Sequence, residues 1–261
     1  MACMGSFKSG EQLWTDRLGN LRNVIRQDLI GRQLAAHVRP GLSVLDVGCG
    51  QGTQALRLAL HGCAVTGVDP SSDLLARFAA SAAAADAPVE LLEGTLDDLD
   101  ALLGSRLFDV VCTHGVLMYL DDRPGALARL SDRVSGTSGR LSITVRNGHA
   151  LAMRPGLRGD WQGAIEAFRS GTYVNEIGVQ ARADRIEEVR GDLAQVGMEI
   201  VEWSGVRVFN DAISPAAAPP SGPELDQLLD AEDLAGRQDP YRWMASQLHV
   251  IAGRPGSASV P

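Results

Sequence analysis

Residues 44–52 read Val44-Leu45-Asp46-Val47-Gly48-Cys49-Gly50-Gln51-Gly52, an apolar strand that runs into three glycines at alternate positions. Where a strand turns into its helix, a cofactor that lies almost on the backbone needs the space that side chains at these glycines would take. Asp69 ends the next apolar run, 17 residues after the last glycine, and a carboxylate there can accept both hydroxyls of a ribose. Strand, glycines and distal acid together predict a site for a cofactor that contains adenosine.

The glycine spacing separates two classes of such cofactors. A dinucleotide fingerprint runs GxGxxG and leaves a helix N-terminus open to the pyrophosphate. Here the spacing is GxGxG, and Asp46 lies two residues before the first glycine. That acid would repel a pyrophosphate, whereas it suits a cofactor that carries an ammonium and a sulfonium group. The sequence therefore disfavours a nicotinamide-dependent oxidoreductase.

Three later segments extend the pattern. Residues 65–69 form the apolar run that ends in Asp69, residues 94–99 read Gly94-Thr95-Leu96-Asp97-Asp98-Leu99, and residues 108–114 read Phe108-Asp109-Val110-Val111-Cys112-Thr113-His114. In this order, the four segments resemble the motifs of the class I S-adenosylmethionine (SAM) dependent methyltransferases.

That resemblance implies SAM as the cofactor and S-adenosylhomocysteine as its product. It also implies that Leu96 lies on the adenine face, that Asp97 lies near the exocyclic amine, and that the strand ending at His114 reaches the cofactor. Arg22 is a candidate either for the carboxylate of the cofactor or for the substrate. The expected cofactor-binding residues are Arg22, Asp46, Gly48, Cys49, Gly50, Gly52, Asp69, Pro70, Leu96, Asp97, Thr113 and His114.

The hydrophobic periodicity predicts an α/β fold with a doubly wound, seven-stranded, mostly parallel sheet of the Rossmann-like type. Apolar positions at helical spacing predict a helix over residues 11–38. Runs rich in Val, Leu and Ile are typical of buried strands, and the last strand is expected to be antiparallel. The expected strands are residues 42–47, 64–68, 89–92, 108–113, 139–145, 198–203 and 246–252, and the expected helices between them are 53–61, 72–85, 96–103, 123–134 and 183–196.

Two long connections interrupt this pattern and are expected to shape the substrate side, because long connections in compact domains are usually functional or disordered. The resulting organisation is an N-terminal helical cap over 1–40, a SAM-binding core over 41–145, an insertion over 146–182, and the remainder of the core over 183–261 with a second insertion at 206–245.

Composition excludes several classes of protein. The chain has 261 residues, of which 45% are hydrophobic, and no apolar run approaches the roughly 18 residues that a membrane span needs. The four cysteines Cys3, Cys49, Cys63 and Cys112 share no metal-ligand spacing. We therefore expect reduced thiols, no metal site, no membrane contact and a cytoplasmic location.

Short segments outside the SAM motifs resemble the tRNA 5-carboxymethoxyuridine methyltransferase family, which esterifies the carboxylate of a modified wobble uridine. That family's pattern carries a run of lysines after the fifth strand, whereas residues 169–176 here are nearly neutral. The segments that carry the resemblance are residues 19–22, 147–149, 205–211, 237–241 and 248–250.

Charge leaves the acceptor open between tRNA and a small molecule. The formal net charge is −8, but residues 139–169 hold five arginines against two acids, whereas residues 221–240 hold six acids against one arginine. Because phosphate contacts supply much of the affinity for nucleic acid, a polarised surface is a weak indication of RNA binding. The oligomeric state is open as well.

The chemistry of methyl transfer defines the candidate catalytic residues. A carboxylate acceptor is ionised at neutral pH and needs cations, for which Arg22, Arg146 and Arg207 are candidates. A hydroxyl acceptor needs a base, a role open to His114, His149 and Asp211. The expected catalytic set is therefore His149, Arg146, Arg207 and Asp211. The alternatives are a small-molecule O-methyltransferase and a non-catalytic SAM-binding domain.

Overall fold

The computed structural model describes residues 19–175, 178–214 and 216–256. Residues 1–18, which include Cys3 and the first part of the helix expected over 11–38, lie outside the described residues. Within the described part, the N-terminal element is helix α3 (Leu21–Ala35). Its first turn is capped by Asn20, whose side chain accepts a hydrogen bond from the Asn23 backbone N–H.

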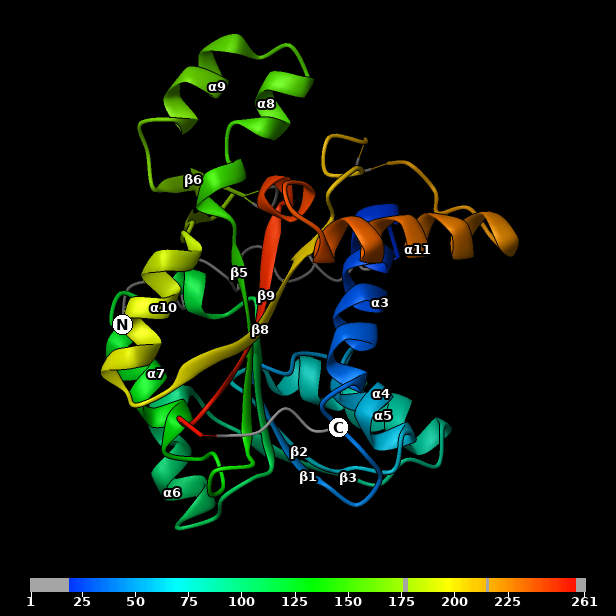
Figure 1. Ribbon diagram of the computed structural model, residues 1–261. Coiled ribbons are helices and arrows are strands. Elements are labelled where there is room, and N and C mark those ends of the chain that lie inside the picture. The colour runs from blue at the N-terminus through cyan, green and yellow to red at the C-terminus, as the bar shows by residue number, and fades with distance from the viewer. Residues whose placement is uncertain (1–18, 176–177, 215, 257–261) are drawn as a thin grey trace.

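One seven-stranded sheet runs through the molecule in the order β3-β2-β1-β4-β5-β9-β8 (Figure 1). Strands β1 to β5 are parallel to one another, whereas β9 is antiparallel to both β5 and β8. This confirms the predicted doubly wound sheet and its antiparallel last strand. The strands are β1 (Ser43–Val47), β2 (Ala64–Asp69), β3 (Val89–Glu93), β4 (Val110–His114), β5 (Arg140–Arg146), β8 (Glu199–Val206) and β9 (Gln247–Gly253).

Helices cover both faces of the sheet, and a separate apolar core lies between the helices and the sheet on each face. On one face pack α3, α4 (Ala55–Leu60) and α5 (Ser72–Ala84). On the other face pack α6 (Leu99–Leu103), α7 (Arg123–Ser131) and α10 (Ile186–Gln195). The helix expected over 96–103 is divided, because Thr95 and Asp98 form a capping box that makes residues Leu96–Asp98 a separate 3-10 turn, η1.

Each of the two long connections contains structure of its own. Residues 146–182 hold the short helices α8 (Met153–Leu157) and α9 (Trp161–Ala167) and the hairpin of β6 (Thr172–Val174) and β7 (Gln180–Arg182). In Figure 1, α8 and α9 lie beyond the carboxyl end of β5. After β8 the chain forms helix α11 (Pro223–Arg237), which lies near α3, and the turn η4 (Tyr241–Met244). No helix in the described ranges is long and apolar enough to cross a membrane.

Two of the three motif glycines are required by packing inside the protein. Gly48 has φ +75°, and a Cβ there would lie 2.3 Å from Val116 Cγ2. Gly52 has φ +82°, and a Cβ there would lie 2.2 Å from Phe78 Cδ2. From the sequence, these glycines were expected to leave space for a cofactor that lies on the backbone. The structure adds a second reason, since the neighbouring side chains already fill the space.

We expect the substitution Gly52→Ala to destabilise the fold more than Gly197→Ala. Both positions have positive φ, which costs an alanine about 1–2 kcal/mol, but a Cβ at Gly197 meets nothing within 4 Å. The clash with Phe78 adds about 1–3 kcal/mol. Chemical denaturation of the two variants measures the difference. Equal losses in the two variants would show that Phe78 moves aside at no cost.

Candidate functional site

Asp69 joins the glycine loop to the end of β2. One of its carboxylate oxygens accepts a hydrogen bond from the Gly50 backbone N–H at 2.8 Å, and the other accepts one from the Ser71 N–H at 2.9 Å. These two contacts orient the carboxylate, whose oxygens can each accept more than one hydrogen bond. Pro70, between Asp69 and Ser71, fixes the turn that brings the second donor into place.

Asp46 is a buried acid without a cationic partner among the described residues. Burial and repulsion from Asp69 raise the pKa of Asp46 to about 7. Its register partner on β4 is Cys112, so Asp46, Cys112 and His114 point to the same face of the sheet. An uncompensated acid at this position fits a ligand that carries positive charge.

The other residues expected at the cofactor lie around the same edge of the sheet. Leu96 is buried, whereas Asp97 is exposed and forms a 3.4 Å ion pair with Arg129. The Thr113 hydroxyl donates to the Val47 carbonyl oxygen at 3.1 Å and links β4 to β1. Burial raises the pKa of the Cys49 thiol, which therefore stays protonated.

An arginine cluster lies on the substrate side of this edge. Asp211 forms ion pairs with Arg146 at the end of β5 (3.3 Å), Arg154 of α8 (2.7 Å) and Arg207 after β8 (3.2 Å). Arg22 of α3 donates to the Asp211 carbonyl oxygen at 3.4 Å. These contacts bring together three of the four residues expected to be catalytic: Arg146, Arg207 and Asp211.

Two further charged groups lie near this cluster. The charge of Arg26, one helical turn after Arg22, lowers the pKa of Arg207, and the Glu232 carboxylate also faces Arg207. Among the described residues, five guanidinium groups therefore lie near two carboxylates. Burial lowers the pKa of Arg207 to about 10, which still leaves it charged at neutral pH. Such a cluster fits an anionic ligand.

The comparisons with known proteins fit this arrangement. A methyltransferase-domain family profile matches residues 44–135. The chain is 28% identical to the tRNA 5-carboxymethoxyuridine methyltransferase of Escherichia coli (strain K12), over 96% of this chain and 94% of that protein. The protein is a SAM-dependent methyltransferase. The expected resemblance to class I enzymes and the expected cofactor are thereby confirmed.

Two more distant proteins show how widely the similarity extends. The methyltransferase is 26% identical to the ubiquinone biosynthesis O-methyltransferase of Rhizobium rhizogenes (strain K84), over 77% of this chain and 78% of that protein. The magnesium protoporphyrin IX methyltransferase of Synechocystis PCC 6803, solved with bound S-adenosylhomocysteine, has the same fold. The two structures superpose with a TM-score of 0.62, and their sequences are 17% identical, with 94% of each chain covered.

Two residues that the sequence did not single out position the arginine cluster of the methyltransferase. Arg154 provides the shortest ion pair to Asp211, and only the excess of arginines in its insertion pointed to it. Glu232 of α11 is buried and accepts hydrogen bonds from the backbone N–H groups of Val208, Phe209 and Asn210. It thereby fixes the segment between Arg207 and Asp211, where Arg207 adopts a positive φ of 63°. Strained backbone of this kind occurs mainly at functional sites.

The structure does not favour the bases expected for a hydroxyl acceptor. The three arginines hold the pKa of Asp211 well below its usual range, so it is a very weak base. Burial and the charge of Arg26 lower the pKa of His114 to about 3. His149 lies 3.0 Å from Glu187 of α10 and packs edge-on against Trp243 of η4, and neither of these residues belongs to the ion pairs of Asp211.

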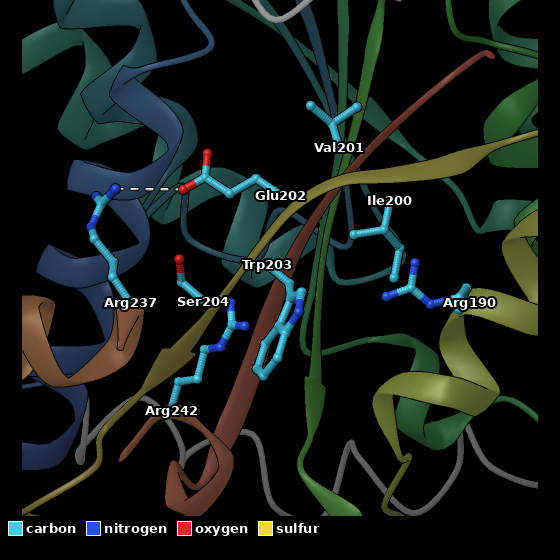
Figure 2. Close-up of a pocket in the computed structure, with 8 residues that line it drawn as sticks. All are labelled: Arg190, Ile200, Val201, Glu202, Trp203, Ser204, Arg237 and Arg242. Carbon is cyan, nitrogen blue, oxygen red and sulfur yellow. Dashed lines mark hydrogen bonds and ion pairs between the residues drawn. The ribbon is translucent and has the colours of Figure 1, made fainter. Parts of the chain in front are cut away.

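A groove of about 530 Å³ lies along β8, away from this site (Figure 2). Its side chains come from both faces of β8, and β9, β5 and β4 separate that strand from β1. Two of the three arginines that line it have partners, since Arg237 pairs with Glu202 and Arg242 lies over the Trp203 ring. The groove is therefore a feature of the sheet edge rather than part of the candidate site.

SAM affinity is expected to fall as pH decreases from 7.5 to 5.5. Asp46 titrates near pH 7 in the free protein, and a cation bound beside it favours the ionised form, so binding must expel a proton at lower pH. Over this range the dissociation constant should rise roughly tenfold. Isothermal titration with wild type and with Asp46→Asn measures it. The variant should bind more weakly and without this pH dependence, and identical profiles would remove Asp46 from the cofactor site.

Proposed function

We propose that this methyltransferase esterifies a carboxylate, and that its acceptor is 5-carboxymethoxyuridine in tRNA. The observation that carries the proposal is the arginine cluster, in which three guanidinium groups converge on the one carboxylate of Asp211 at the end of β5. Guanidinium groups match the geometry of carboxylates and bind them through paired hydrogen bonds.

The state of the candidate bases also favours a carboxylate over a hydroxyl. A hydroxyl must lose its proton, and a positioned base accelerates that step by about 10²–10⁴-fold. Asp211 and His114 have strongly lowered pKa values, and the contacts of His149 are to Glu187 and Trp243 rather than to the arginine cluster. A carboxylate is already ionised at neutral pH and needs no base.

In this proposal the two halves of the site hold ligands of opposite charge. Bound SAM supplies a methyl group activated by the sulfonium. Asp69 holds the ribose and Asp46 faces the cationic part of the cofactor. Arg146, Arg154 and Arg207 hold the acceptor carboxylate in place of Asp211. Because alignment of the reacting groups supplies most of the acceleration, these residues act chiefly by positioning.

Two observations support tRNA as the acceptor. The relative from Escherichia coli named for this substrate aligns over nearly the whole of both chains, including the two long connections. Helix α9 also exposes Trp161, with Phe168 directly after it, and exposed aromatic rings are the usual platforms for unstacked RNA bases. Arg169 follows these rings in the sequence.

A small carboxylic acid is the second candidate acceptor. The net charge of −8 and the nearly neutral residues 169–175 favour it, because a tRNA body needs many cationic contacts. The chemistry at the arginine cluster would be the same, so the two candidates differ only in what surrounds the carboxylate.

Transfer of tritiated methyl from labelled SAM tests both the chemistry and the acceptor. The substrates are tRNA with 5-carboxymethoxyuridine, an unmodified transcript of the same tRNA, and a metabolite extract. We expect label only in the modified tRNA, and we expect mild base to release it as methanol, as for a methyl ester. Base-stable label would contradict esterification. Base-labile label in the extract alone would establish the small-acid alternative.

Arg154→Ala is expected to raise the KM for the acceptor at least tenfold, because a charge-assisted hydrogen bond contributes about 1.5–3 kcal/mol. The dissociation constant for SAM should stay within about twofold. Arg158→Ala is the matched control, since Arg158 ends the same helix but bonds to the backbone carbonyl oxygens of Ala212 and Ile213. Equal effects of the two substitutions would indicate a structural role for Arg154.

A further inference from the structure

A chain of hydrogen bonds between four side chains runs across the sheet to the carboxyl end of β4. His114 Nε2 lies 2.8 Å from Ser142 Oγ, and that hydroxyl lies 2.8 Å from His249 Nε2. His249 Nδ1 lies 2.8 Å from Gln33 Oε1 on α3. Neither the arginine cluster nor the glycine loop accounts for this chain.

The donors and acceptors along this chain fix one protonation pattern. The Gln33 amide is oriented by its Nε2, which donates to the Gly205 carbonyl oxygen at 3.5 Å, so Oε1 accepts from His249 Nδ1–H. Burial lowers the pKa of His249 well below its usual range, so the ring is neutral and its Nε2 is an acceptor.

The remaining protons follow from this assignment. Ser142 has one hydroxyl proton and must donate it to His249 Nε2. Its oxygen then accepts from His114 Nε2–H. A neutral His114 with its proton on Nε2 has a bare lone pair on Nδ1.

This lone pair has no hydrogen-bond partner in the described structure, although Nδ1 is inaccessible to solvent. Thr144, the register partner of His114 on β5, likewise has a buried hydroxyl without a partner among the described residues. Buried polar atoms in native proteins are nearly always satisfied, so two such atoms on neighbouring strands at the carboxyl edge of the sheet are suited to a ligand bound there. The residue next to His114 is Gly115, and a Cβ there would lie 3.7 Å from Arg26 Nη1.

We propose that His114 Nδ1 accepts a hydrogen bond from an N–H or O–H group of a bound ligand, and that Ser142, His249 and Gln33 position it by fixing its tautomer. The donor belongs either to the ammonium group of the cofactor or to the methyl acceptor. His114 is at the end of β4, beside β1 in the sheet, and on the same face as Asp46, which places it between the two halves of the site. With its low pKa, the ring orients a ligand and does not remove a proton from it.

Two substitutions at position 114 separate the two ring nitrogens. His114→Asn places an amide oxygen near the position of Nδ1, whereas His114→Gln reaches only the position of Nε2. If the cofactor is the donor, SAM binding by isothermal titration should weaken at least tenfold in His114→Gln and less than threefold in His114→Asn. If the acceptor is the donor, SAM affinity should be unchanged and the same contrast should appear in the KM for the acceptor. Similar values for the two variants in both measurements would overturn the proposal.

Nuclear magnetic resonance of the wild-type protein tests the tautomer without relying on a variant that folds. The protein is labelled with ¹⁵N-histidine, and its five histidines are distinguished by the loss of one signal in His114→Asn. Long-range ¹H–¹⁵N spectra should show His114 as the neutral Nε2–H tautomer, and its Nδ1 signal should shift when SAM or the acceptor is added. An Nδ1–H tautomer, or no shift with either ligand, would overturn the assignment.

The positioning role has its own matched pair. Gln33→Leu removes the acceptor that holds His249 Nδ1–H, so His114 should populate both tautomers in the same spectra. Gln33→Glu keeps an acceptor at this position and should preserve the single tautomer. A single tautomer in both variants would contradict the positioning role. The acceptor arm rests on the proposed carboxylate methylation, whereas the cofactor arm and the spectra do not, so the failure of one is distinguishable from the failure of the other.

Discussion

The ion pairs of Asp211 hold the substrate side of the molecule together. This carboxylate meets guanidinium groups from the end of β5, from helix α8 and from the segment after β8, and its backbone carbonyl accepts from Arg22 on α3. Removal of one partner from a buried ion pair typically costs about 3–5 kcal/mol, because the remaining charge is left buried and unpaired. One side chain thus fixes both long connections of the chain against the same edge of the sheet.

The two halves of the site bury charge of opposite sign. Asp46 and Asp69 lie near the glycine loop, where the charge of Asp69 disfavours the ionisation of Asp46, whereas three arginines surround Asp211. Placing like charges close together in a buried site is costly in the free protein. Each arrangement is relieved by a ligand of complementary charge. Under the proposed function, a cationic cofactor and an anionic acceptor would be the two ligands that relieve this repulsion.

The sequence predicted the strands closely, because buried parallel strands and a glycine turn have strong local signals. The packing of Val116 on Gly48 and of Phe78 on Gly52 was not predictable, since each contact joins residues far apart in the chain. The role of Asp211 was not predictable for the same reason, because its partners Arg146 and Arg154 lie far from it in the sequence. From the sequence, Asp211 was a candidate base. The fold shows that it is the counter-ion of three arginines. The proposed roles of the cofactor residues remain predictions.

Asp211 also changes how affinity for a carboxylate acceptor should be understood. Under the proposed function, the acceptor carboxylate replaces one that the protein already provides, so the gain from the arginines is a difference between two similar ion pairs. Arg154 is the partner that can exchange at least cost, because it lies on a short helix outside the sheet and is partly exposed. Most of the discrimination between acceptors must then come from other contacts. The exposed side chains of α9, which project from the same insertion, are placed to supply them.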